Sequence, residues 1–301
     1  MNYHTPVMLE ESLNGLNIKP DGTYVDLTFG GGGHSNSILS NLSEKGSLYS
    51  FDVDADALIN VDIIKNNSFN FIEGNFRFFG NFLKLKGKKK VDGIIADLGI
   101  SSHQIDTEER GFSIRGINNL DMRMNAALQI SASDLLNTYK LEKLIRIFSE
   151  YGEIRNSIQL ANFIVKKRSL KKIKTNLDLI DIIKPFAIKN RENKYYAKVF
   201  QALRIEVNDE INALKDFLIQ TPQTLNDKGR LVIISYHSLE DRLVKNFINK
   251  GNFIGESKKD LYGNEKLFFK PINKKPITPK FTEIKNNPRA RSAKMRIGKL
   301  I

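Results

Sequence analysis

The stretch Asp26-Leu-Thr-Phe-Gly-Gly-Gly-Gly-His34 decides the fold of this chain. The β-rich run Thr23–Phe29 leads into four consecutive glycines, and a helical pattern begins directly after them, at Ser35. Glycine allows the backbone to approach a ligand closely and to adopt positive φ. The first turn of a helix presents backbone N–H groups that lack partners. The stretch therefore predicts a strand, a ligand-binding turn and a helix, in that order.

Strand-like and helical segments alternate on the carboxyl side of this turn. Strands are expected over 47–52, 69–73 and 91–98, and helices over 35–42 and 55–65. This alternation is typical of βαβ units and a parallel sheet. The first hundred residues therefore predict an α/β domain.

The pattern changes near residue 107. Leu141, Leu144, Ile145 and Phe148 follow helical spacing, and no strand is evident over about a hundred residues. Ser131 and Asp134, like Thr175 and Asp178, have the spacing of capping boxes. Strand character returns at 230–236, and short β-like runs follow at 267–270 and 294–298.

These segments predict a discontinuous domain with an insertion. We expect residues 1–106 and 206–301 to form a class I, Rossmann-like α/β domain that ends in a basic tail. We expect residues 107–205 to form an inserted all-helical domain that recognises the substrate.

Asp52 adds to the case for an adenosine-containing cofactor. It ends the second expected strand, about 20 residues after the glycines, where a carboxylate can accept hydrogen bonds from ribose hydroxyls. A dinucleotide site would need a third glycine at Ser35 or Asn36, and neither position matches. Asp26, four residues before the first glycine, instead favours S-adenosylmethionine. A nicotinamide cofactor remains the alternative on this motif.

Asp97 ends the fourth expected strand. In an open α/β sheet the ligand lies beyond the carboxyl ends of the strands, so Asp97–Gln104 is expected to border the active site. The alternative is that Asp97 is a loop or helix-cap carboxylate without a chemical role.

The net charge of +13 is concentrated in two segments. Residues 106–205 contain 19 basic and 11 acidic side chains, and residues 245–301 contain 15 and 4. This asymmetry indicates a polyanionic partner, with a generally lysine-rich surface as the alternative. Candidate phosphate contacts are Lys166–Lys174 in the insert and four basic residues of the tail, Arg289, Arg291, Lys294 and Arg296.

The composition also excludes several classes of protein. The chain has no cysteine, so disulfides and thiolate metal sites are excluded, and no metal site is expected. No apolar run is long enough to span a membrane, and Met1–Leu13 does not resemble a signal peptide. A cytoplasmic protein without a membrane partner is expected.

Nine motifs, in order along the chain, resemble the MraW/RsmH family of bacterial small-subunit ribosomal RNA methyltransferases. They are His4–Glu11, Gly30–Ser35, Asp97–Ser102, Arg110–Ser113, Leu120–Met124, Tyr151–Glu153, Phe200–Ile205 with Val207-Asn208, His237–Arg242 and Asn287–Ser292. The resemblance implies a class I domain with a helical insert, methylation of the exocyclic N4 amine of one cytosine in the decoding region, and the small ribosomal subunit as partner. DNA is not expected as a partner, and the oligomeric state stays open.

The resemblance also implies site residues. By position, the cofactor contacts fall on Gly32, Gly33, His34, Asp52, Phe76, Asp97 and Gln104. Phe76 would pack on adenine, with a core phenylalanine as the alternative. Apart from the resemblance, the hydrogens of a weakly nucleophilic amine need acceptors, so Asp97 and Ser101 are expected to border the target amine as catalytic residues. Phe112, Tyr195 or Tyr196 would stack on the displaced base.

One departure from the family pattern concerns Lys194–Lys198, where relatives usually carry His-Pro-Ala-Thr-Arg. This puts a catalytic role for the missing histidine in doubt. Near the end of the chain, His237, Ser238 and Asp241 are too close together for a catalytic triad, and Ser238 with Asp241 has the spacing of a helix cap. Two other functions stay open: a non-catalytic RNA-binding assembly factor, and a methyltransferase that acts on DNA or protein.

Overall fold

The computed structural model describes residues 6–257 and 267–301. The chain forms two compact units, one of Met1–Gly99 with Asn212–Ile301 and one of Ile100–Ile211. The second unit begins seven residues before the insert that we expected over 107–205, and it ends six residues after it. Among the described residues, no helix is long and apolar enough to cross a membrane.

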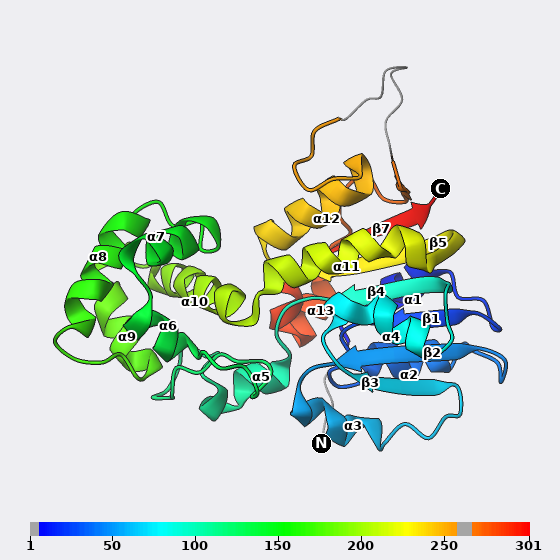
Figure 1. The fold of residues 1–301 in the computed structure, drawn as a ribbon, viewed down its shortest axis with the longest axis horizontal. Helices are drawn as coiled ribbons and strands as arrows, with labels where there is room; N and C mark the ends of the chain where they lie inside the picture. The colour runs from blue at the N-terminus through cyan, green and yellow to red at the C-terminus, as the bar shows by residue number, and fades with distance from the viewer. Residues whose placement is uncertain (1–5, 258–266) are drawn as a thin grey trace. The chain divides into compact units, whose positions relative to one another are not determined.

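The first unit contains a seven-stranded sheet with the order β3-β2-β1-β4-β5-β7-β6 (Figure 1). Its strands are β1 (Thr23–Asp26), β2 (Ser47–Asp52), β3 (Phe69–Glu73), β4 (Val91–Asp97), β5 (Leu225–Ser235), β6 (Phe269–Pro271) and β7 (Lys294–Leu300). The first five strands are mutually parallel, and β7 runs antiparallel to β5 and β6. The strand order reverses direction between β1 and β4, which is the ligand-binding position of doubly wound sheets. The predicted Rossmann-like fold is confirmed.

Helices cover both faces of this sheet. On one face, α4 (Phe79–Leu85), α11 (Glu210–Thr224) and α12 (Ser238–Lys250) contribute side chains to one apolar core. On the other face, α1 (Leu9–Leu16), α2 (Gly33–Leu39) and the 3₁₀ turn η5 (Pro288–Ser292) contribute to a second core. Two faces of helices explain why the central strands are apolar throughout, as at Ile94–Ala96.

Two elements of the first unit differ from the sequence prediction. The helix expected over 55–65 is only a 3₁₀ turn, η1 (Ala55–Ala57), followed by α3 (Leu58–Val61). The strand expected from residue 230 begins at Leu225. Asn226–Gly229 have turn-like composition, but Leu225 pairs with Val91 across a register shift and so extends β5.

The second unit is helical. It contains α5 (Ser102–Asp106), α6 (Ala132–Thr138), α7 (Leu141–Glu150), α8 (Ser157–Arg168), α9 (Asn176–Ile183), α10 (Glu192–Asn208) and the short turns η3 (Glu108–Arg110) and η4 (Lys184–Phe186). Its buried core draws on Leu135, Leu144, Phe148 and Leu203, all within the unit. The capping boxes predicted at Ser131 and Thr175 are confirmed.

Two short elements complete the first unit. The 3₁₀ turn η2 (Phe76–Phe78) connects β3 to α4, and α13 (Phe281–Asn286) precedes the last turn before β7. The Oε1 atom of Glu283 accepts a hydrogen bond of 2.7 Å from the backbone N–H of Met8. This bond links the amino-terminal segment to a residue 275 positions later.

Candidate active site

The carboxyl ends of β1, β2 and β4 meet at one edge of the sheet. β1 lies between β2 and β4, and Asp26 pairs in register with Ser50 on one side and Ile95 on the other. The side chain of Thr28 accepts a hydrogen bond from the backbone N–H of Asp97 at 2.7 Å. The glycine turn after β1 and the loop after β4 are therefore joined directly.

The glycine turn needs glycine at two positions because of its backbone conformation. Gly30 and Gly32 have φ values of +50° and +76°, a region that favours glycine. A Cβ atom on Gly30 would meet no heavy atom within 4 Å, so the space beside it is open. Gly32 is the N-cap of α2, and Gly33 is the first residue of this helix. The turn therefore offers an open position next to the unpaired N–H groups of α2.

Asp26 stabilises the glycine turn through hydrogen bonds to a residue before the turn and a residue after it. It is 1% exposed, accepts a hydrogen bond from the backbone N–H of Thr28 at 3.1 Å, and accepts one from the Ser35 hydroxyl at 2.7 Å. The Ser35 hydroxyl lies 2.7 Å from that of Ser50 on β2. Asp26 thus connects the end of β1, the start of α2 and β2, and each of its carboxylate oxygens accepts a hydrogen bond within the unit.

Asp52 also stabilises the glycine turn, through a hydrogen bond from Gly30. One carboxylate oxygen accepts the backbone N–H of Gly30 at 2.7 Å, and the other accepts that of Asp54 at 2.9 Å. Burial raises the pKa of Asp52 to about 6, although these backbone hydrogen bonds act in the opposite direction. Each oxygen keeps a second lone pair that a ligand hydroxyl can use.

Asn60 makes a further hydrogen bond to the glycine turn. The sequence analysis did not identify this residue. Its Nδ2 donates to the carbonyl of Gly30 at 3.0 Å, while its Oδ1 is buried without a hydrogen-bond partner. Asp52 and Asn60 therefore fix both ends of the Gly30 residue. Asn60 lies in α3, and its contact with Gly30 depends on how this helix packs, which the helix expected over 55–65 did not reveal.

His34 and Phe76 occupy opposite sides of this region. His34 is 6% exposed, and its Nε2 lies 3.1 Å from the carbonyl oxygen of Val7, so the ring fixes the amino-terminal segment. Phe76 is half-buried and makes an edge-on contact with Phe217, with ring centroids 6.0 Å apart. Phe76 follows β3 directly after the turn at Gly74-Asn75, next to the end of β2.

Asp97 is paired with a residue that sequence analysis did not select. The hydroxyl of Tyr236, which directly follows β5, donates to Oδ1 of Asp97 at 2.8 Å. Oδ2 of Asp97 has no hydrogen-bond partner among the described residues. The neighbouring strands β4 and β5 bring the two side chains together across 139 positions, a pairing that sequence alone could not indicate.

Burial raises the pKa of Asp97 to about 6, while His34 and the Tyr236 hydrogen bond oppose this rise. Burial and the negative charge of Asp97 raise the pKa of Tyr236 above its usual range. Tyr236 therefore stays a hydrogen-bond donor, and Asp97 is mostly ionised at pH 7.5. This arrangement suits a carboxylate that accepts hydrogens from a substrate.

Ser101 and Gln104 belong to the second unit, where they cap each other. The Ser101 hydroxyl accepts the backbone N–H of Gln104 at 3.1 Å, and the Gln104 Oε1 accepts that of Ser101 at 3.0 Å. This capping box begins α5. Both residues thus have a structural role in the loop that follows Asp97.

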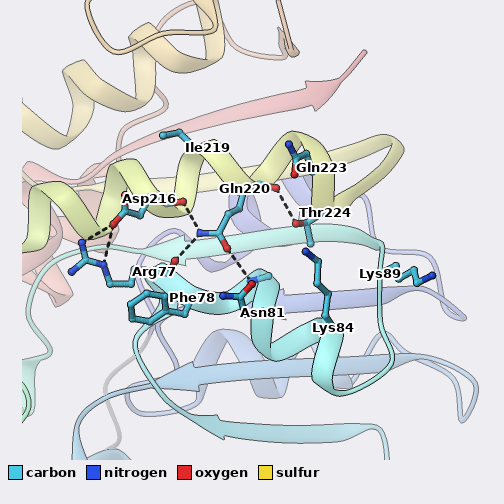
Figure 2. Close-up of a pocket in the computed structure, with 11 residues that line it drawn as sticks. Arg77, Phe78, Asn81, Lys84, Lys89, Asp216, Ile219, Gln220, Gln223 and Thr224 are labelled. Atoms are coloured by element: carbon cyan, nitrogen blue, oxygen red, sulfur yellow. Dashed lines mark hydrogen bonds and ion pairs between the residues drawn. The ribbon is translucent and has the colours of Figure 1, made fainter.

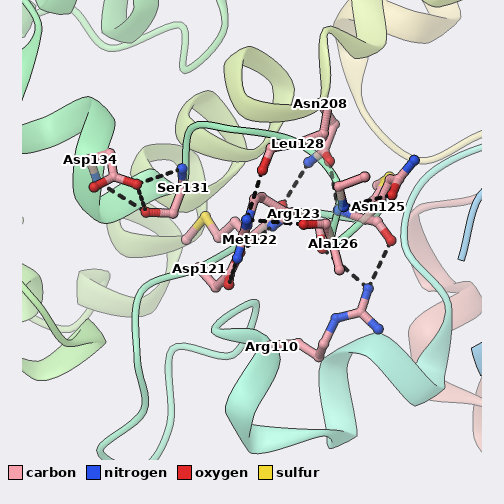
Figure 3. Close-up of polar contacts among 12 residues, drawn as sticks. Arg110, Asp121, Met122, Arg123, Asn125, Ala126, Leu128, Ser131, Asp134 and Asn208 are labelled. Carbon is pink, nitrogen blue, oxygen red and sulfur yellow. Dashed lines mark hydrogen bonds and ion pairs between the residues drawn. The ribbon is translucent and has the colours of Figure 1, made fainter. Parts of the chain in front are cut away.

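The motif segments of the second unit form a tight polar network (Figure 3). Arg123 makes a bidentate contact with Asp121 at 2.7 and 2.8 Å, and Arg110 donates to the carbonyls of residues 123 and 124. Asn208 on α10 accepts from the backbone N–H of Met124 and donates to the carbonyl of Met122, a buried residue with φ of +63°. The network holds an extended loop in one conformation.

Three expectations for RNA contacts prove wrong, those for Arg296, Phe112 and Tyr196. Arg296 is 7% exposed and binds Asp241 through two hydrogen bonds of 2.6 and 3.2 Å, and Lys294 lies 3.6 Å from the same carboxylate. Asp241 therefore pairs with β7 and does not cap α12. Phe112 and Tyr196 lie in the core of the second unit and are not free to stack on a base.

The cap of α12 is His237 rather than Ser238. His237 has extended backbone geometry directly before the helix, and its ring accepts a long hydrogen bond of 3.4 Å from the backbone N–H of Glu240. The triad interpretation remains excluded, because Asp241 is held by Arg296.

The Lys194–Lys198 departure is accommodated within the second unit. Lys198 donates to the carbonyl of Glu153 at 3.2 Å, and the Tyr195 hydroxyl donates to Asn156 at 3.2 Å. Both side chains tie α10 to the segment that includes the Tyr151–Glu153 motif. Part of another motif, His4-Thr5, lies outside the described residues.

The chain is similar to several known proteins. A family model described as the MraW methylase family matches residues 1–301. The chain is 52% identical over 300 residues to the ribosomal RNA small subunit methyltransferase H of Parabacteroides distasonis, covering 99% of this chain and 98% of that protein. It is 54% identical over 295 residues to the protein of the same name from Cytophaga hutchinsonii, covering 98% of each. Among solved structures, an rRNA methylase from Streptococcus thermophilus has 11% identity and a TM-score of 0.44, covering 100% of this chain and 99% of that one.

Proposed function

Because the chain belongs to the MraW methylase family, we propose that it transfers a methyl group from S-adenosylmethionine to small-subunit ribosomal RNA. The proposed acceptor is the exocyclic N4 amine of a cytosine in the decoding region. The partner would be the small ribosomal subunit or its RNA, in the cytoplasm. The observation that carries the proposal is the pairing of Asp97 with Tyr236 at the strand edge where Asp52 holds the glycine turn.

The chain's residues fit the proposed cofactor. Open space lies beside Gly30, and the Asp52 carboxylate beside it can accept hydrogen bonds from two ribose hydroxyls. Asn60 of α3 bonds to the same turn, and its buried Oδ1 is a hydrogen-bond acceptor without a partner. We assign cofactor binding to the seven residues expected from the sequence, namely Gly32, Gly33, His34, Asp52, Phe76, Asp97 and Gln104.

The chemistry requires a hydrogen-bond acceptor next to the substrate amine. S-adenosylmethionine supplies an electrophilic methyl group on its sulfonium sulfur. A cytosine amine is a poor nucleophile because its lone pair is delocalised into the ring. The free Oδ2 of Asp97 would accept a hydrogen bond from this amine and take its proton, while Tyr236 fixes the carboxylate through Oδ1. Alignment of the amine can contribute on the order of 7–11 kcal/mol.

Ser101 is the second residue proposed to border the amine. Its backbone N–H and its hydroxyl are used in the α5 capping box, but its carbonyl and a second hydroxyl lone pair remain available as acceptors. Its place four positions after Asp97 supports the assignment. Ser101→Ala, which keeps the carbonyl, tests whether the hydroxyl itself takes part.

The second unit is proposed to recognise the RNA. Lys166, Lys172 and Lys174 are exposed, and their side-chain amines make no hydrogen bond or ion pair with a described residue. Arg291, in the turn before β7, is exposed as well. Exposed cations of this kind contact phosphate without reading sequence, whereas Arg168 and Lys171 are already bound to Leu136 and Asp178.

The test is transfer of a radiolabelled methyl group from S-adenosylmethionine to small subunits that lack the modification. Naked ribosomal RNA, duplex DNA and ribosomal protein are compared in parallel. Label on a cytosine N4 of the small-subunit RNA is expected. Label on DNA or protein would replace the proposed substrate, and absence of label despite cofactor binding would favour a non-catalytic assembly factor.

A further inference from the structure

A groove lies between the η2–α4 segment and α11, on one face of the sheet in the first unit (Figure 2). Its volume is about 330 Å³, which is within the range of small-ligand sites. The Gln220 carboxamide spans it, accepting from the backbone N–H of Gly80 at 3.2 Å and donating to the carbonyl of Arg77 at 2.6 Å. A Cβ atom on Gly80 would lie 2.9 Å from the oxygen of this carboxamide, so a side chain at this position would displace the Gln220 side chain.

The groove carries a positive charge. Lys84 and Lys89 line it and are exposed, and their side-chain amines form no hydrogen bond or ion pair with a described residue. Asp216 is the acid among its described lining residues, and Arg77 neutralises it through hydrogen bonds of 3.1 and 2.6 Å. The two lysines are therefore available to an anionic group of a ligand.

Apolar and amide groups accompany this charge. Phe78 is 50% exposed and Ile219 is 56% exposed, so both present apolar surface to a ligand in the groove. Asn81 and Gln223 are exposed amides that make no hydrogen bond with a described residue. An aromatic face stacks on a base, amides bind base edges, and lysines bind phosphate. The groove offers all three.

The groove also has a suitable position in the unit. Phe78 comes two residues after Phe76, which follows β3 at the candidate active site. Lys89 comes two residues before β4 begins at Val91, at the opposite edge of the sheet. The groove therefore leads from the neighbourhood of the active site along the side of the first unit.

We propose that this groove binds an unpaired nucleotide of the RNA substrate, outside the site of methyl transfer. The inference rests on the proposed function, because it takes RNA as the substrate. A free nucleotide has the same chemistry as a nucleotide in an RNA strand, and the experiments below separate these two sources.

The first experiment compares Lys84→Glu/Lys89→Glu with a matched control, Lys45→Glu/Lys274→Glu, which changes two exposed lysines elsewhere in the same unit. KM for undermethylated small subunits is measured at saturating S-adenosylmethionine and at several salt concentrations. The groove variant is expected to raise KM about tenfold and to reduce the salt slope by about 2, since two phosphate contacts are lost. The control is expected to match the wild type.

Thermal unfolding and S-adenosylhomocysteine binding verify that both variants are folded. Equal KM values and equal salt slopes for the groove variant and the control would overturn the inference. The wild type is assayed on the same subunits, so a failure of the proposed function appears as no transfer by any protein. Failure of the groove inference appears instead as normal transfer by the groove variant.

The second experiment places p-benzoylphenylalanine at position 78 of the full-length protein and irradiates the complex with small subunits. A cross-link to a ribosomal RNA nucleotide supports the inference. A cross-link to a ribosomal protein alone would overturn it. So would a cross-link to cytidine monophosphate without one to RNA, because the groove would then be a free-nucleotide site.

Discussion

Asp97 and Tyr236 predict how the reaction responds to pH. An aspartate that accepts a proton works only when ionised, so kcat should fall as pH falls through about 6, the pKa of Asp97. Tyr236→Phe removes a hydrogen bond that stabilises the carboxylate, so the pKa should rise and the acid limb should move to higher pH by about half a unit or more. Measuring kcat from pH 5 to 8.5 at saturating cofactor tests this. If the acid limb of kcat stays at the same pH in Tyr236→Phe, Tyr236 does not tune the group that accepts the proton.

Asp97 also predicts a trade-off between stability and activity. Its folded pKa of about 6 lies above its ordinary value of 3.8, so its ionised form destabilises the fold above pH 6, and this cost disappears as pH falls toward 4. Asp97→Asn should therefore raise the free energy of unfolding at pH 7.5 by about 1–3 kcal/mol. It should lower kcat by about 10²–10⁴-fold. Urea unfolding at pH 7.5 and 5 with parallel assays tests both, and full activity would exclude Asp97 as the base.

Asn60 predicts a change confined to cofactor affinity. Asn60→Asp cannot donate to the Gly30 carbonyl and places a negative charge against it, so KM for S-adenosylmethionine should rise about tenfold, while kcat at saturation changes little. Asn66→Asp is the control, because the Asn66 side chain accepts from Ser68 and aspartate keeps that bond. A kcat effect equal to the KM effect would contradict a role in shaping the turn.

At the scale of elements, the Arg296–Asp241 pair connects β7 to α12. The two side chains are 8% and 13% exposed. Arg296→Ala would leave a mostly buried carboxylate with only the more distant Lys294, so the free energy of unfolding should fall by about 2–4 kcal/mol. Arg291→Ala, on an exposed arginine of the preceding turn, should leave stability unchanged. Denaturant unfolding tests this, and equal stabilities would show that the pair contributes nothing.

The elements show which patterns in the sequence were informative. The strand-turn-helix at Asp26–His34 and the capping boxes at Ser131 and Thr175 were predictable because each depends on neighbours within a few positions. The cap of α12 was predicted at the wrong residue, because β5 ends at Ser235 and leaves His237 as the extended residue before the helix. Local spacing alone could not separate the two positions.

The candidate site was predictable only in part. Asp52 and Asp97 lie at the carboxyl ends of predicted strands, so their position at one sheet edge could be expected. Tyr236 and Asn60 could not, since the first depends on which strand lies next to β4 and the second on where α3 ends. Arg296 was predicted to contact phosphate because it is basic. The sequence does not show that β7 brings it to Asp241, which pairs with its charge.

At the scale of the whole molecule, the second unit has its own apolar core. Its buried cluster includes Leu120, Ile147, Ile164 and Val199, all between Ile100 and Ile211. A fragment of residues 100–211 should therefore fold alone into a helical domain with a cooperative thermal transition. Circular dichroism and differential scanning calorimetry test this. A molten fragment, or one without a transition, would mean that its core depends on the rest of the chain.

The discontinuity of the first unit has a consequence for synthesis on the ribosome. Strand β4 ends at Asp97, but its neighbour β5 is complete only at Ser235. At 5–20 residues per second, the translating ribosome needs roughly 7–28 s to make the intervening chain. During this interval the nascent sheet has an unpaired edge, which is a template for wrong pairing. The glycine turn and Asp52 are already made, yet Asp97 has no Tyr236, so a prematurely terminated chain would be prone to aggregate and would lack a complete active site.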